Sequence, residues 1–373
     1  MTVYLDHAAT TPMRPQAVAA MLPYLTEHFG NPSGAHALAR QARAAIDDAR
    51  DAVAAALGAQ PGEIVFTGSG TEADNLAIHG RLRAAGPGRA VCSAVEHHAV
   101  LHPVESTNGT VVAVGGDGVI DLEQLAATLD DDVVVVSVML VNNEVGTIQP
   151  LADVADAVRR HAPNALVHTD AVQAAPWLDI ADVAAAADLV AVSAHKFGGP
   201  KGVGALVTRD RASLVPIIEG GGQERDRRSG THNVAGIVGM AAALDATVAE
   251  RAATVARVRR LRDRLTDELL RAVPNAIETG RRENKIAAAC HLLFEGVESE
   301  ALVLLLDDAG LAASAGSACA SGALEPSHVL LAMGVDRSLA RSGLRLSLGW
   351  SSTDDDVDLA LKVVPEAVAR LTK

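Results

Sequence analysis

The chain has 373 residues, of which 49% are hydrophobic and 21% charged, and these proportions exclude a disordered, collagen-like or disulfide-framework protein. A formal net charge of −14 and an aromatic content of 2% disfavour nucleic acid as the main ligand, because phosphate binding needs Lys and Arg and single strands stack on aromatic rings. No apolar run could span a bilayer, and no signal peptide or cysteine framework is evident, so we expect a cytoplasmic protein with no membrane partner.

Residues from about 47 to 246 alternate short β-branched runs with Ala-rich stretches. The expected strands are EIVF, AVCSAV, VVVVSVMLV, ALVHTD, DLVAVSA and GALVT. This rhythm predicts a mainly parallel α/β sheet. One long helix is expected over 248–270, where it could bridge two domains. After Pro274, strands (AAACHLLFEG, LRLSLGW) mix with helices, which predicts a smaller α+β domain.

Four of the expected strands run directly into polar residues. IVFT leads into GSGT at 68–71, VSVMLV into NN at 142–143, LVHT into Asp170, and LVAVSA into HK at 195–196. Ligands of open parallel sheets bind beyond the carboxyl ends of the strands. All four segments are therefore expected to line one crevice.

Gly70 and Thr71 open a predicted helix, so backbone N–H groups and a hydroxyl can converge on a phosphate. A plain glycine turn is the alternative, and the spacing does not fit a dinucleotide fingerprint.

His97 follows the strand AVCSAV and can stack on a pyridine ring and move protons. His98 and His102 are spaced like zinc ligands, but we expect Pro103 to end that helix at once, a capping or surface role for His98, and no metal site.

Asp170 could keep the ring nitrogen of pyridoxal phosphate (PLP) protonated, or it could cap a helix. Gln173, one turn later, lies on the same side and could donate to the phenolic oxygen of that ring. The chain has five lysines against 27 arginines, and the first is Lys196, after an apolar strand. A lysine desolvated there can attack a carbonyl, as PLP enzymes require, although a surface lysine is the alternative.

The segment GGGQERDRRSGT, which contains Thr231, suggests an ordered loop that reaches a phosphate or a neighbouring subunit. Cys319 lies in a run of small residues that can form a mobile loop, whereas Cys92 and Cys290 lie in predicted strands and are expected to be buried and inert. Arg345 is alone in an apolar strand and needs an anion, either a substrate carboxylate or an acid of an adjoining helix.

The motifs between Tyr4 and Gly349 resemble those of the cysteine desulfurases: YLDHAATTP, FGNPSGAH, IVFTGSGTEADNLAI, EHHAVL, VNNEVGTIQP, HTDAVQ, SAHKFGGPKGVGAL, GGGQERDRRSGT, SAGSACASGALEPSHVL and LRLSLG. The cysteine loop is similar to that of the NifS/IscS branch. The resemblance implies an α/β fold-type I PLP enzyme of the class V aminotransferase group, working as a homodimer. The large domain, with a seven-stranded sheet, would cover 14–255. The small domain would cover 1–13 and 256–373 and carry the mobile loop at about 312–325.

The resemblance also implies a role for each matching residue. Lys196 would hold PLP covalently as an aldimine, Cys319 would be the nucleophile that forms a persulfide, and His97 would stack on the ring and exchange protons. Asn143 and Arg345 would face the substrate. The residues that bind the cofactor would be Gly70, Thr71, Asn143, Asp170, Gln173, Ser193, His195 and Thr231, the last donated by the other subunit.

The implied reaction removes sulfur from L-cysteine, releases L-alanine and leaves a persulfide on Cys319. The family passes this sulfur to iron–sulfur cluster scaffold proteins or to tRNA thiolation proteins. The alternatives are a selenocysteine lyase, another class V PLP enzyme such as an aminotransferase, a protein in which the fold is only structural, and a sulfur donor for DNA modification. Longer family members dock a scaffold through a C-terminal tail beyond the position of Lys373, so the resemblance leaves the acceptor open.

Overall fold

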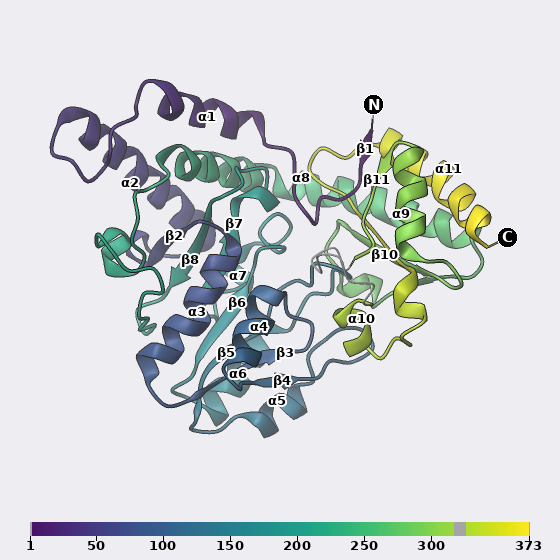
Figure 1. Ribbon diagram of the computed structural model, residues 1–373, viewed down its shortest axis with the longest axis horizontal. Coiled ribbons are helices and arrows are strands. Elements are labelled where there is room, and N and C mark those ends of the chain that lie inside the picture. The colour runs from purple at the N-terminus through teal and green to yellow at the C-terminus, as the bar shows by residue number, and fades with distance from the viewer. Residues whose placement is uncertain (1, 317–325, 373) are drawn as a thin grey trace.

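The computed structural model describes residues 2–316 and 326–372 (Figure 1). Within this part, a seven-stranded sheet has the order β2-β8-β7-β6-β5-β3-β4. Its strands are β2 (Ile64–Thr67), β3 (Arg89–Ser93), β4 (Thr110–Val112), β5 (Val133–Ser137), β6 (Leu166–Asp170), β7 (Leu189–Ser193) and β8 (Gly204–Thr208). Neighbouring strands are parallel except that β8 is antiparallel to both β2 and β7.

The mainly parallel α/β sheet is thereby confirmed, with two differences. The number of strands, seven, agrees with what the resemblance implies, but the runs identified in the sequence did not include edge strand β4, and β5 ends at Ser137 although its apolar run continues to Val141. Every residue of β5, β6 and β7 is buried, as expected for parallel strands covered on both faces. The elements that surround this sheet are α1 (Pro15–Thr26), α2 (Ala37–Leu57), η1 (Pro61–Glu63), α3 (Gly70–Ala85), α4 (His98–Ser106), α5 (Leu122–Thr128), α6 (Leu151–His161), α7 (Ile180–Val183), η2 (Ala194–Lys196) and η3 (Gln223–Asp226).

The second part of the molecule contains two small sheets. Strands β9 (Ala276–Glu278), β10 (Ala289–Phe294) and β12 (Gly343–Ser347) form an antiparallel sheet, and β1 (Val3–Tyr4) pairs in parallel with β11 (Leu311–Ala312). The first strand of the chain therefore lies beside a strand near its end. The other elements of this part are η4 (Arg282–Asn284), α9 (Ser299–Asp308), α10 (His328–Ala332), η5 (Leu339–Ser342) and α11 (Asp354–Leu371).

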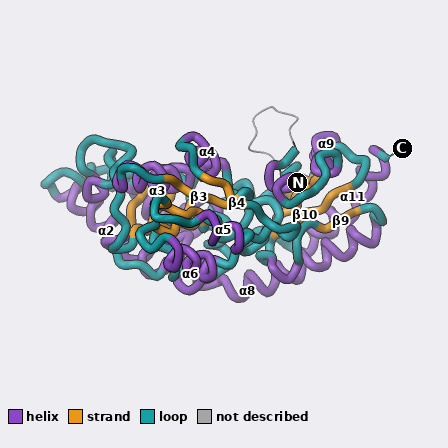
Figure 2. Tube along the Cα trace, turned by 90° about the horizontal axis from the view of Figure 1, so that it is seen from below, coloured by secondary structure: helices purple, strands orange, loops and turns teal. Residues whose placement is uncertain are grey.

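Helix α8 (Val234–Ala272) connects the two parts and is longer than predicted, with 39 residues. It begins where the Asn233 side chain accepts a hydrogen bond from the Gly236 N–H, which is an N-cap that the sequence analysis did not use. Figure 2 shows α8 running below both the large sheet and the strands β9 and β10. The domain boundary expected between residues 255 and 256 therefore lies inside a continuous helix.

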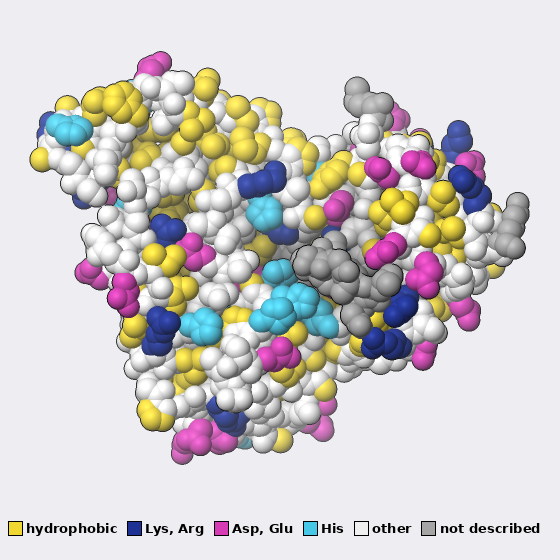
Figure 3. Space-filling model, in the orientation of Figure 1, with side chains coloured by type: hydrophobic (Ala, Val, Ile, Leu, Met, Phe, Trp, Pro, Cys, Tyr) yellow, Lys and Arg dark blue, Asp and Glu magenta, His cyan; other side chains and the backbone are white. Residues whose placement is uncertain are grey.

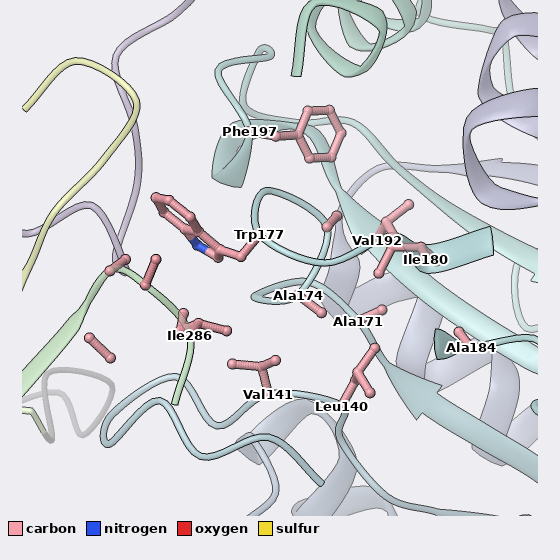
Figure 4. Packing of buried hydrophobic residues seen from close by; sticks show 14 of the residues in the cluster. Leu140, Val141, Ala171, Ala174, Trp177, Ile180, Ala184, Val192, Phe197 and Ile286 are labelled. Carbon is pink, nitrogen blue, oxygen red and sulfur yellow. The ribbon is translucent and has the colours of Figure 1, made fainter. Parts of the chain in front are cut away.

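The largest hydrophobic cluster also joins the two parts. It includes Val192 and Phe197 near the end of β7, Trp177, and Ile286 next to the small sheet. Figure 4 shows these side chains as one group. The strand ends and the small sheet thus share one packed core, which fixes both walls of the space between them.

One predicted boundary was wrong, because Pro103 does not end helix α4, which continues to Ser106. A proline inside a helix leaves a carbonyl four residues earlier without its N–H partner. That carbonyl belongs to Ala99 and instead accepts a hydrogen bond of 3.0 Å from the Asn75 side chain of α3. Among the described residues, no helix is both long and apolar enough to cross a membrane.

Candidate active site

The polar residues at the strand ends line one cavity of about 520 Å³. Sites for small molecules typically measure roughly 300–1,000 Å³. The predicted site residues on its wall are Gly70, Thr71, His97, Asn143, Asp170, Gln173, Ser193, His195, Lys196 and Arg345. Thr231 is exposed and is not part of this wall, and Cys319 lies outside the described residues.

Residues 68–71, here called the phosphate cradle, form the turn between β2 and α3. Ser69 caps the helix by accepting a hydrogen bond of 3.1 Å from the Glu72 N–H. Gly70 packs so closely that an added Cβ would lie 2.8 Å from Val172 Cγ2 and 3.3 Å from Ser193 Cβ. The free N–H groups of a helix start, together with nearby hydroxyls, suit a phosphate group.

Asp170 ends β6, lines the cavity and is only 5% exposed. Its Oδ1 accepts a hydrogen bond of 2.8 Å from the Val172 N–H. Burial raises the pKa of Asp170 to about 6, while the hydrogen bond from Val172 and the charge of Lys196 oppose this shift. A buried carboxylate in this place can bind a protonated ring nitrogen.

Three further buried ionisable residues, Asp74, Glu96 and His168, were not predicted from the sequence, and Asp74 lines the cavity together with Asp170. Asp74 Oδ1 is 3.5 Å from His168 Nε2, and neither atom has a hydrogen-bond partner. Glu96 accepts hydrogen bonds of 2.7 Å from the Ser93 hydroxyl and from the Met139 N–H. Burial raises the pKa of Glu96 to about 8 and that of Asp74 well above its usual value.

A sequence signal for two of them existed. His168 is two residues before Asp170 on β6 and so lies on the same face of the sheet, and Asp74 is one helical turn after Gly70. Glu96, which precedes His97, offered no comparable signal.

Lys196 lies in η2, directly after β7. Its Nζ donates hydrogen bonds to the carbonyl oxygens of Ala8, at 2.5 Å, and Ala9, at 3.0 Å. Gln173 Nε2 donates to the same Ala8 oxygen at 2.7 Å. His195 also contacts this N-terminal segment, because its Nδ1 is 3.1 Å from the Thr10 hydroxyl. The segment 8–10 therefore closes one side of the cavity.

His97 caps helix α4 by accepting a hydrogen bond of 3.1 Å from the Ala99 N–H at its Nδ1. The cap is therefore His97 and not His98. Burial, and next the charge of Lys196, lower the pKa of His97 to about 4, so the ring is neutral at pH 7. A neutral imidazole that accepts at Nδ1 carries its proton on Nε2.

The ring of His98 lies 4.7 Å from that of His102 and 4.6 Å from that of His328, measured between ring centroids. Figure 3 shows histidine side chains gathered near the middle of this face. Within residues 2–316 and 326–372, however, no group of three or more His, Cys, Asp or Glu side chains is arranged to hold a metal ion.

Arg345 on β12 is 4% exposed and reaches the cavity wall. Its Nη2 forms an ion pair of 2.8 Å with Asp6 Oδ1, and its Nη1 donates to the Asn143 carbonyl at 3.1 Å. The internal acid is thus in the turn after β1 and not in an adjoining helix. The Nε atom is buried and has no partner, so the guanidinium keeps a donor for a further anion.

Cys92 and Cys290 lie in β3 and β10 with no exposed surface, as predicted. Burial raises the pKa of both thiols, which makes them poor nucleophiles at neutral pH.

The arrangement fits PLP on structural grounds. The phosphate cradle has no room for a Cβ at Gly70, a buried carboxylate faces the same cavity, and an amine and a neutral imidazole also line it. The phosphate, the ring nitrogen and the aldehyde of PLP would therefore each have a residue of suitable chemistry in this cavity.

Comparisons with known proteins agree. The sequence profile of the aminotransferase class-V family matches residues 3–360. The chain is 45% identical to an IscS-like cysteine desulfurase from Mycobacterium tuberculosis, over 98% of this chain and 96% of that protein. A solved NifS-like protein has a TM-score of 0.92 at 35% identity, over 99% and 100% of the two chains. A structure of SspA in complex with cysteine has a TM-score of 0.80 at 32% identity, over 94% and 100%.

The chain belongs to the aminotransferase class-V family, whose members are PLP-dependent, and within it to the cysteine desulfurases, which remove sulfur from cysteine. This confirms the predicted fold class and the predicted type of enzyme.

Proposed function

We propose that this chain transfers the sulfur of L-cysteine to Cys319, forms a persulfide there and releases L-alanine. The observation that carries the proposal is the convergence of Lys196, Asp170 and His97 on one cavity with the phosphate cradle at its edge. The names of the desulfurase relatives, and the cysteine bound in the SspA structure, support cysteine as the substrate.

Lys196 Nζ would bind PLP covalently, and Asp170 would hold its ring nitrogen in the protonated form. Thr71, Ser193 and His195 would bind the phosphate, and Gln173 the phenolic oxygen. When bound, PLP withdraws electrons from the amino acid joined to it and so weakens the bonds at that amino acid's carbon atoms.

Arg345 and Asn143 would bind and orient the substrate. The buried Nε of Arg345 has no partner, and a substrate carboxylate would supply one. Asp6 holds the same guanidinium from the other side, so Arg345 stays in place before the substrate arrives.

Lys196 and His97 would hold and move protons. Lys196 Nζ would take a proton from the substrate's Cα, and the carbonyls of Ala8 and Ala9, which accept its hydrogen bonds, would keep it at the cavity wall. His97 Nε2–H would donate a hydrogen bond towards the substrate sulfur, because Nδ1 is occupied by the helix cap.

The described ends of the segment that carries Cys319 both lie near Glu144. An added Cβ at Gly316, a cavity-wall residue, would lie 3.4 Å from Glu144 Oε2, and the Ser327 hydroxyl donates to that oxygen at 2.5 Å. Gly316, which is part of the cavity wall, stands three residues before Cys319 in the sequence. The thiolate would form a bond to the substrate sulfur while the bond between that sulfur and Cβ breaks, and Cβ then takes a proton.

We propose a homodimer in which Thr231 of each chain binds the phosphate in the other chain's site. Large hydrophobic side chains are exposed on and around α1, among them Leu22, Leu25 and Phe29. Figure 3 shows hydrophobic side chains along this part of the surface. An exposed apolar surface of this kind supports a partner chain.

The IscS names of the relatives support an iron–sulfur cluster scaffold protein as the sulfur acceptor, with tRNA thiolation proteins as a second destination. Three cysteines are too few for a disulfide framework, which supports a reducing compartment such as the cytoplasm. We retain the division into a large domain at 14–255 and a small domain at 1–13 and 256–373, with the cysteine loop at about 312–325, as part of this proposal.

The test is to incubate PLP-loaded protein with L-cysteine and a reductant and to quantify alanine and sulfide. We expect equal amounts of both, and a fall of at least about a hundredfold in Cys319→Ser. Cys92→Ala is the matched control and should keep full activity, since Cys92 is buried in β3. Alanine release that does not depend on Cys319 would contradict the proposal.

A further inference from the structure

The loop at residues 220–232, here called the clamp loop, lies outside the cavity wall and has a strained backbone. Glu224, Arg225 and Asp226 have φ angles of 50°, 56° and 63°. Three consecutive non-glycine residues in the left-handed region are unfavourable, because each Cβ approaches its own backbone. Such a backbone persists only where surrounding contacts hold it.

The first of these contacts is made by Glu224, which is 6% exposed. Its two carboxylate oxygens accept hydrogen bonds of 2.8 and 2.7 Å from Arg50, and one of them lies 2.7 Å from His232 Nε2. Burial alone would raise the pKa of Glu224, but the hydrogen bonds from His232 and Arg50 outweigh it and hold the pKa at about 2. Glu224 is therefore a fixed negative charge at neutral pH.

Glu224 also binds the strand that leads to the phosphate cradle. Its Oε2 accepts a hydrogen bond of 2.9 Å from the Phe66 N–H on β2, and Arg50 Nη1 donates to the Ile64 carbonyl of the same strand at 2.7 Å. The Arg50 guanidinium lies 4.7 Å from the centroid of the Phe66 ring. The last residues of β2 are thus held by the clamp loop through side chains rather than through the sheet alone.

The second contact is made by Arg228. Its Nε and Nη2 donate to the two oxygens of Glu72 at 2.7 and 3.2 Å. Glu72 Oε2 in turn accepts a hydrogen bond of 2.8 Å from the Gly68 N–H in the cradle. An added Cβ at Gly68 would lie 2.8 Å from that oxygen, so only glycine leaves room for this contact.

We infer that Glu224 and Arg228 are positioning residues that hold the phosphate cradle in shape, Glu224 through Phe66 and Arg228 through Glu72 and Gly68. The inference rests on the proposed function, because it takes the cradle to be the site of the PLP phosphate. The two ion pairs bind backbone N–H groups at alternate positions, 66 and 68, directly before the N–H groups that would face the phosphate. A shift in either pair would therefore move the donors of the cradle.

The same loop carries Thr231, which is proposed to bind the phosphate in the partner subunit. The clamp loop would therefore hold the phosphate cradle of its own site and also carry Thr231, which would bind the phosphate in the partner's site. Removal of Glu224 or Arg228 is expected to weaken PLP binding without removing any group that touches the cofactor.

The experiment compares wild type with Glu224→Gln, Arg228→Gln and Arg228→Lys. Arg264→Gln is the matched control, because Arg264 also forms side-chain ion pairs, with Glu268 and Asp358, but far from the cavity. Two quantities are measured for each protein: the dissociation constant of PLP, by titration of the cofactor-free protein, and the phosphorus NMR shift of the bound phosphate. Thermal unfolding of the cofactor-free proteins selects the temperature at which all of them are folded.

We expect the two Gln variants to bind PLP about tenfold or more weakly, since each loses a hydrogen bond between charged groups, and to shift the phosphorus resonance. Arg228→Lys should recover part of both effects, and Arg264→Gln should match wild type. Binding within twofold of wild type, or weaker binding with an unchanged resonance in both Gln variants, would overturn the inference. Failure of wild type itself to bind PLP would instead refute the proposed function.

Discussion

Three buried carboxyl groups, those of Asp74, Glu96 and Asp170, lie close enough together for their charges to interact. Like charges in a medium of low dielectric cannot all be ionised cheaply. Burial, and next the charges of Asp170 and Glu96, raise the pKa of Asp74, whereas Lys196 lowers that of Asp170 against the effect of burial. The negative charge of this group therefore belongs on Asp170, where the ring nitrogen would bind.

The first prediction concerns Asp74→Asn in the cofactor-free protein. Because the folded pKa of Asp74 is raised above its unfolded value, the folded wild type binds the extra proton and loses stability as pH rises above the unfolded value. The amide that replaces this carboxyl group does not titrate. The variant should therefore gain stability on wild type as the pH rises from 5 to 7.5, by at most about 1.4 kcal/mol per pH unit, measured by urea unfolding at one protein concentration. A stability difference that does not change with pH would show that Asp74 is ionised in the folded protein.

The second prediction concerns Arg345→Gln, which removes the proposed carboxylate ligand. The KM for L-cysteine should rise about tenfold to a hundredfold, because a charge-assisted hydrogen bond is lost, while kcat changes less. Steady-state kinetics measure both constants. Asp6→Asn is the comparison variant, since it weakens the same ion pair without removing the guanidinium, and its KM should rise less than that of Arg345→Gln. Equal rises of KM in both variants would show that Arg345 serves only its ion pair with Asp6 and does not bind the substrate.

For single helices and strands, the sequence predicted which elements exist better than where each of them begins and ends. Six of the strands were expected from their β-branched runs, whereas the short β-branched run of β4, Thr110–Val112, was not predicted as a strand. Helix α4 continues past Pro103 because a side chain from α3, Asn75, satisfies the carbonyl that the proline leaves free. A long-range contact of this kind is not visible in a local pattern.

The start of α3 gives the third prediction, on Gly70→Ala. The new methyl group would meet Val172 and Ser193 and push the helix start away from β7, so PLP should bind about tenfold more weakly. Titration of the cofactor-free protein gives the dissociation constant. Gly116→Ala is the control, because its added Cβ would have only the Met333 carbonyl within contact, at 3.7 Å. An unchanged dissociation constant of PLP in Gly70→Ala would show that the phosphate does not bind at this end of the cavity.

At the scale of the whole molecule, exposed apolar surface around α1 predicts the oligomeric state. Leu22 and Leu25 are 58% and 64% exposed, and a glutamate at each position would oppose burial against a second chain. Light scattering should give the mass of two chains for wild type and the mass of one chain for the double variant with Leu22→Glu and Leu25→Glu. Leu304→Glu is the matched control, since Leu304 is 68% exposed but lies on α9. A monomeric wild type would contradict the proposed homodimer and the donation of Thr231.

The sequence located the cavity because its residues stand at strand ends, where the order of a parallel sheet brings them together. It did not reveal the buried ionisable residues Asp74, Glu96 and His168, nor the ion pairs of the clamp loop, because these depend on which helix and loop pack beside each strand. The expected domain boundary could not be found in composition either, since α8 continues through it without a break.

The most direct test of the central claim is mass spectrometry of the protein after brief mixing with L-cysteine in the absence of reductant. Under the proposed function, the peptide containing Cys319 should become heavier by one sulfur atom, and dithiothreitol should remove the addition. The peptides containing Cys92 and Cys290 should be unchanged, because both thiols are buried. Release of alanine with no sulfur added at Cys319, or with sulfur added at another cysteine, would contradict it.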